Sequence, residues 1–165
     1  MFKPSRNTLL ALSFVAIVQT ASFAQWADTG VDVGPGHAGA TAGANGDIWQ
    51  WTDTQSRVGG AGSFGQGVAI GVGRNGVSFS HSIGANGGGA GVGHNINMTI
   101  GRNGSHVSHG GVTSRGGNSR VQVGGGSGQQ FGGISGGSTA TGWGRNTNTW
   151  SNSNTQRFPR VIRRW

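Results

Sequence analysis

The feature that most constrains this chain is a pattern of alternating side chains that occurs twice, 28 residues apart. Residues 68–81 read VAIGVGRNGVSFSH and residues 96–109 read INMTIGRNGSHVSH. In each copy an Asn-Gly pair separates two stretches in which bulky residues alternate with small or polar ones. Such alternation indicates β-strands, and Asn-Gly between two alternating stretches is the strongest short-range signal for a hairpin. The two copies therefore predict two β-hairpins within an imperfect 28-residue repeat.

The turns of these hairpins are predicted at the Asn-Gly pairs, because a type I′ turn needs positive φ at both central positions. The four turn residues are Asn75, Gly76, Asn103 and Gly104. With the turns placed there, Val72 lies opposite Phe79, and Ile100 lies opposite Val107. The bulky apolar residues of each hairpin then share one face, since a strand turns successive side chains to opposite faces.

The opposite face of the predicted hairpins carries small and polar side chains. Ala69 and Gly71 lie there with Ser78 and Ser80. Two interpretations of this flat face are open. The simpler expectation is a polar surface that water covers. The alternative is a surface that stacks closely on another sheet, as flat sheets do in silk, which would make it cohesive between chains.

We therefore expect an all-β fold for residues 44–153, a Gly-rich antiparallel meander of hairpins or a short β-solenoid. Residues 44–51 contain a further Asn-Gly pair followed by alternating aromatic residues, and are interpreted as a degenerate copy of the repeat unit. Weaker strands are predicted at 112–114 and 121–123.

Two segments flank this predicted repeat domain. Residues 25–43 are expected to form a flexible, acidic segment rich in Gly and Ala, and residues 154–165 a basic aromatic tail. Glycine makes up 36 of the 165 residues. Because glycine loses more conformational freedom on folding than any other residue, disorder is expected at the ends and within residues 126–142.

The first 24 residues have the three parts of a secretory signal peptide. Lys3 and Arg6 form a charged start, residues 9–18 an apolar stretch, and residues 22–24 a small-x-small cleavage site. We expect a mature chain that begins at Gln25 and is secreted or held at the cell surface, with the periplasm as an alternative. The sequence contains no Cys, so no disulfide can staple the exported chain.

Charge is divided along the predicted mature chain. Its four acids, all Asp, precede residue 54, and its ten Arg follow that residue. The tail residues expected to contact an anionic surface are Arg157, Arg160, Arg163, Arg164 and Trp165. Because guanidinium groups pair with carboxylate or phosphate and stack on rings, the expected partners are an anionic polysaccharide or a membrane surface. Nucleic acid is not expected for a secreted chain.

Two short motifs with catalytic associations lack the context that their chemistry needs. Residues 71–76 match G-x-G-x-x-G, but an alternating strand follows instead of the helix that binds a dinucleotide. Residues 133–137 match G-x-S-x-G, but no His or acid follows them to complete a triad. His81, His94 and His109 could approach one another, yet packing against apolar neighbours is the expected role. We predict no catalytic, cofactor-binding or metal-binding residues, and no enzyme.

In composition the chain resembles Gly-rich secreted proteins, among them attacin-like antibacterial proteins and bacterial surface fibre subunits. The function that the sequence favours is a secreted, non-enzymatic structural or cell-surface protein that self-associates through sheet edges. The alternative is a cationic antimicrobial protein, or one that binds membranes or polyanions through its Arg-rich C-terminal part.

Overall fold

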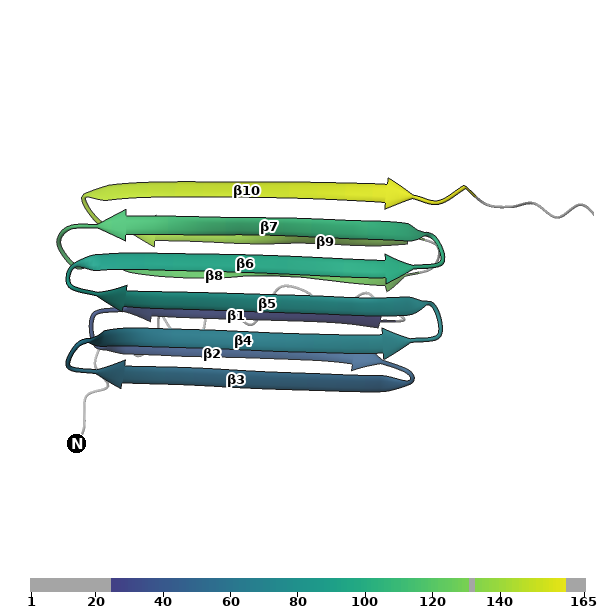
Figure 1. Cartoon of the computed structure of the whole chain (residues 1–165), viewed down its shortest axis with the longest axis horizontal. Coiled ribbons are helices and arrows are strands. Elements are labelled where there is room, and N and C mark those ends of the chain that lie inside the picture. Colours follow the sequence, from purple (N-terminus) through teal and green to yellow (C-terminus); the bar gives the residue numbers. More distant parts are fainter. Residues whose placement is uncertain (1–24, 131–132, 160–165) are drawn as a thin grey trace, which may run out of the picture.

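The protein, seen here as a computed structural model that describes residues 25–130 and 133–159, folds entirely into β-structure within those residues (Figure 1). Its ten strands pair only in antiparallel fashion and build two flat sheets that lie face to face, without closing into a barrel. In this part of the chain no helix is long and apolar enough to cross a membrane. The expectation of an all-β, antiparallel fold is confirmed.

The larger sheet has six strands in the order β10-β7-β6-β5-β4-β3. Their bounds are β3 Trp49–Gly59, β4 Gly62–Gly73, β5 Gly76–Gly87, β6 Ala90–Gly101, β7 Gly104–Arg115 and β10 Asn146–Arg157. Strands β3 to β7 follow one another as a simple meander, so the meander is realised here and the solenoid is not.

The smaller sheet has four strands in the order β2-β1-β8-β9. Their bounds are β1 Gln25–Gly34, β2 His37–Gly46, β8 Arg120–Gln130 and β9 Gly133–Trp143. The chain passes between the sheets three times, after β2, β7 and β9. The strands predicted at 112–114 and 121–123 therefore belong to different sheets.

The predicted type I′ turns are wrong in their placement. Gly73 pairs with Gly76, so that Arg74 and Asn75 are the two loop residues. In the second hairpin the loop residues are Arg102 and Asn103, between the paired Gly101 and Gly104. Gly76 cannot occupy the loop because it is also paired with Gly101 on its other side, which holds it within the sheet.

This placement shifts the register of both hairpins by two residues. Val72 lies opposite Val77 instead of Phe79, and Ile100 lies opposite Ser105 instead of Val107. A shift of two residues leaves every side chain on its expected face, because the side-chain period of a strand is two. The division into a bulky apolar face and a flat face is therefore correct although the pairing is not.

The flat face is not solvated but buried inside the molecule, where it packs against the smaller sheet. Ser78, Ser80, Ser82 and Ser108 are all completely buried. The smaller sheet supplies the complementary bulk, because a cluster of valines on β1 and β8 lies over glycines of the larger sheet. The stacking expected between chains thus takes place within one chain, and it removes this face from contact with a second molecule.

Segments expected to be flexible or disordered supply this second layer. Residues 25–43 lie in β1 and β2, and β1 is the most deeply buried strand of the smaller sheet. Most of residues 126–142 lies in β8 and β9. The physical reason is that glycine here gives close approach between the sheets, which offsets its entropic cost. The expected signal peptide, residues 1–24, lies outside the described residues.

Candidate functional site

The interior between the sheets has an apolar part, formed by the valine cluster, and a polar part. The polar part is a network of hydroxyl and amide groups. The Thr29 hydroxyl lies 2.7 Å from those of both Ser80 and Ser82. Asn97 accepts a hydrogen bond from Ser80 at 2.5 Å and donates one to the Gly137 carbonyl at 2.9 Å. These buried side chains bond one another across the two sheets, so the network holds the sheets together.

His106 lies at the end of this polar interior, on the face opposite that of His109. Its side chain is fully buried, and Nδ1 lies 2.7 Å from the Thr155 hydroxyl, while Nε2 has no hydrogen-bond partner. Burial lowers the pKa of His106 below its ordinary value of 6.5. The imidazole is therefore neutral at pH 7, and its place between the sheets is that of a packed core residue.

The outer face of the larger sheet is open to solvent and is organised in rows that run across all six strands. One row contains, in sheet order, Trp51, Ile70, Phe79, Met98, Val107 and Asn154. The next contains Asp53, Val68, His81, Ile96, His109 and Asn152. Large apolar groups are exposed here, including Trp49 and Ile100, each with half of its surface accessible. An exposed apolar surface of this kind is typical of an interaction site.

Two histidines on this outer face surround Trp150 of β10. The ring centroid of Trp150 lies 5.6 Å from that of His94 and 5.1 Å from that of His109. His81 lies near them, and its pKa is lowered by desolvation and by the charge of His94. In the residues that the structure describes, no three His, Cys, Asp or Glu side chains gather closely enough to hold a metal ion. The histidines pack against rings, and this contact with Trp150 was not foreseen from the sequence.

A polar cluster around Asp32 lies on the outer face of the smaller sheet. Arg120 Nε donates a hydrogen bond to Asp32 Oδ1 at 2.7 Å, and Arg120 Nη2 contacts the second carboxylate oxygen. The guanidinium group also lies over the Trp143 ring, 5.2 Å from its centroid, and His37 lies 3.5 Å from Asp32. The hydrogen bond to Asp32 raises the pKa of Arg120. Because Asp32 lies in β1 and Arg120 in β8, the ion pair links these two strands.

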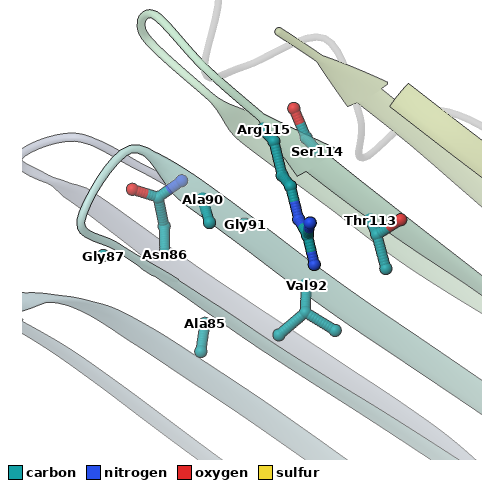
Figure 2. Close-up of a pocket in the computed structure, with 9 residues that line it drawn as sticks. All are labelled: Ala85, Asn86, Gly87, Ala90, Gly91, Val92, Thr113, Ser114 and Arg115. Atoms are coloured by element: carbon teal, nitrogen blue, oxygen red, sulfur yellow. The ribbon is translucent and has the colours of Figure 1, made fainter. Parts of the chain in front are cut away.

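An open hollow of ≈ 540 Å³ lies where β5, β6 and β7 meet their loops (Figure 2). Its lining consists of Ala85, Asn86, Gly87, Ala90, Gly91, Val92, Thr113, Ser114 and Arg115. No carboxylate or imidazole lines it, so it provides no acid–base pair. Asn86 and Ser114 are already hydrogen-bonded to Ser119 and to the Trp143 carbonyl respectively.

The two edges of the larger sheet are its least protected parts. Every residue of β3 and of β10 is exposed, because the smaller sheet is two strands narrower and leaves both edge strands uncovered. Both strands pair with their single neighbour along their whole length without a bulge. Neither contains proline, and each presents an unpaired row of backbone groups on its free side. The edges at β3 and β10 form the candidate functional site.

The turn residues predicted from the sequence lie at one end of the larger sheet, where successive loops are joined. The Asn75 carbonyl accepts a hydrogen bond from the Arg102 amide at 3.0 Å, and the Asn103 carbonyl accepts one from the Phe158 amide at 3.1 Å. These contacts extend the backbone ladder through the loops, so the turn residues have a structural role.

Of the tail residues predicted to contact an anionic surface, Arg157 is the last residue of β10 and pairs with Gly104. The remaining four, Arg160, Arg163, Arg164 and Trp165, lie outside the described residues. Residues 154–157, expected to belong to the tail, are part of β10.

Comparisons of this chain with protein-family models, curated proteins and solved structures gave no match.

Proposed function

We propose that this chain is a secreted, non-enzymatic structural or cell-surface protein that self-associates through the edges of its larger sheet. The observation that carries the proposal is the pair of long, regular and fully exposed edge strands β3 and β10. Natural sheets normally protect an edge with proline, a bulge, a short strand, charged side chains or a covering segment, because a bare edge is a template for another strand. Of these devices β3 has only the oppositely charged Asp53 and Arg57, and β10 has only Arg157 at its end. Edges with so little protection suit a protein that is built to pair.

The use of the polar side chains supports a non-enzymatic role. Many of the Ser, Thr and Asn side chains, together with His106, are buried between the sheets and hydrogen-bonded there, as for Ser80 with Asn97 and His106 with Thr155. Those groups hold the fold and are closed to a substrate. The hollow at β5–β7 supplies no titratable pair.

Residues 25–165, purified and studied over a concentration series, provide the test. We expect light scattering to show growth with concentration, and electron microscopy to show elongated assemblies. Assembly should persist at high salt, because sheet pairing relies on hydrogen bonds and apolar contact, and both are weakly screened. A chain that stays monomeric across the whole series would overturn the proposal.

A second candidate function is binding to a membrane or polyanion, and the exposed apolar outer face favours it. Trp49, Trp51 and Ile100 lie exposed there, and aromatic groups of this kind settle at a lipid interface. Binding to anionic vesicles that falls away as salt is raised, without any self-association, would favour this function over the structural one.

A further inference from the structure

The direction of the strands in the larger sheet determines how a second copy of the chain could continue it. The sheet has six strands, and every neighbouring pair is antiparallel. With an even number of alternating strands, the two edge strands β3 and β10 run in opposite directions. Figure 1 shows them at the two extremes of the sheet. A copy shifted sideways therefore brings its β3 antiparallel to β10 without any rotation.

We infer that β10 of one copy pairs with β3 of the next copy, giving a head-to-tail interface that repeats without closing. This inference rests on the proposed function and specifies its partner, a second copy of this chain. Because the two contacting surfaces differ, each added copy presents a fresh β10 edge, which is the condition for an open filament.

The side chains of the two edges are compatible in the register that a sideways shift produces. The rows of the outer face then continue from one copy into the next, with Asp53 opposite Asn152 and Gln55 opposite Trp150. Arg57 lies opposite Asn148 in the same register. Each charged residue of β3 thus meets an amide. No two like charges are directly opposed, which matters because directly opposed like charges destabilise a strand pair.

The other face of the joined edges carries hydroxyl groups on both sides. Thr52 meets Ser153, Thr54 meets Ser151, and Ser56 meets Thr149 when the rows are extended in this register. Pairs of Thr and Ser directly across two strands stabilise a sheet by hydrogen bonding. In this register β3 is paired along all eleven of its residues.

The smaller sheet leaves room for this contact. It has four strands against six, and the edge strands of the larger sheet project beyond it. A copy can therefore approach without collision between the two smaller sheets. Six strands at a spacing of about 4.8 Å give a predicted axial repeat of about 29 Å.

A charge placed in the row of Asp53 tests the pairing. Asn152→Asp in residues 25–165 sets two carboxylates opposite each other at each interface, and we expect about a two- to fivefold rise in the critical concentration for assembly. The variant also lowers the net positive charge, which by itself would favour assembly, so a rise cannot come from the change in net charge. Thr113→Asp, with the same charge change on β7, is the matched control and should show no rise.

Restoration is the second half of the test. Asp53→Lys combined with Asn152→Asp creates an opposite-charge pair at each interface, and assembly should return to the wild-type critical concentration or below it. Circular dichroism of the dilute monomers checks that the fold of each variant is intact. Fibre diffraction should show the strand spacing together with the axial repeat of about 29 Å.

Three results would count against the inference. If the double variant assembles no better than Asn152→Asp, β3 does not meet β10. If the wild type stops at dimers, the interface joins two identical edges; in both cases self-association survives and only the pairing is wrong. If the wild type does not associate at all, the proposed function itself fails.

Discussion

Val31 of the smaller sheet lies directly over Gly84 of the larger sheet, with no space between them for a methyl group. A Cβ placed at Gly84 would be 2.8 Å from Val31 Cγ1 and 3.1 Å from Val33 Cγ2. The same valine meets Gly65 on the neighbouring strand at the same distance. The two sheets approach closely because the valine side chains of the smaller sheet lie over glycines, which have no side chain, in the larger sheet.

Gly84→Ala should therefore destabilise the fold by about 1–3 kcal/mol, the usual cost of overpacking a core. Gly60→Ala is the matched control, because a Cβ there meets no atom within 4 Å, and it should change stability by less than about 0.5 kcal/mol. Urea denaturation of dilute monomer measures both. Equal midpoints for the two variants would contradict the close contact between the sheets.

The two glycines that begin β5 and β7 should not tolerate a side chain. Gly76 has φ of 150° and Gly104 has φ of 147°, and a Cβ at either would collide with a backbone carbonyl of the adjacent strand, that of Ile100 or Gln156. Alanine at either position should cost more than about 1 kcal/mol. Thermal unfolding followed by circular dichroism tests this, and an unchanged melting temperature in the double variant would refute it.

The contribution of His106 to stability should fall as the pH is lowered below about 6.5, the pKa of an unfolded histidine. Burial raises the pKa of Asp28 to about 6, and this acts in the opposite direction at lower pH. The pKa of His106 is lowered in the folded state, so between its folded pKa and 6.5 the unfolded chain binds more protons. The contribution of the neutral imidazole is complete above 6.5 and is lost as the pH falls through this window. In His106→Asn the slope of unfolding free energy against pH should become less positive than in the wild type near pH 6; an unaltered slope would show that another group is responsible.

Asn97→Asp should show the opposite dependence on pH. The Asn97 amide nitrogen donates to the Gly137 carbonyl and to Asn95 Oδ1 at 2.6 Å, so a carboxylate there would face acceptors while fully buried. Burial would raise the pKa of the new Asp, making the variant least stable above that pKa, with recovery as acid protonates it. At pH 7 we expect a loss of about 1–3 kcal/mol or more. Urea midpoints at pH 5 and pH 7 test this: a loss caused by the buried charge should be smaller at pH 5, whereas a loss caused by altered packing alone should be the same at both pH values.

The placement of side chains on faces could be predicted because it depends only on a period of two. Val72 and Phe79 lie on the outer face as expected, and Ser80 on the other. The register of the hairpin could not be predicted in this way, because it depends on whether Gly76 belongs to the loop or to the strand. Gly76 belongs to the strand because it also pairs with Gly101 of β6. Pairing on both sides of a strand is a property of the whole sheet, and it cannot be predicted from the local Asn-Gly pair.

The smaller sheet as a whole was not predicted from the sequence. Val31 and Val33 alternate with Asp32, which is a strand signal, but the surrounding Gly and Ala residues favoured flexibility in the prediction. The partner of β1 is β8, far away in sequence, and no local pattern points from one to the other. The exposed edges β3 and β10 likewise follow from the strand order, which could not be derived from alternation alone. Self-association through sheet edges was expected, but the sequence did not indicate which strands would lie at the edges.

The pairing of β1 with β8 also has a consequence for the order in which the chain folds. Asp32 and Arg120, which clasp these strands, are 88 residues apart, whereas β3 to β7 form through successive short loops. Contacts between distant residues form late, because closing a long loop costs entropy first. We expect the meander to assemble while its Ser- and Asn-lined face still lacks a cover. During that interval β8 of the same chain competes with strands of neighbouring chains for the vacant place, so the rate of synthesis and the local concentration decide how many molecules reach the closed sandwich.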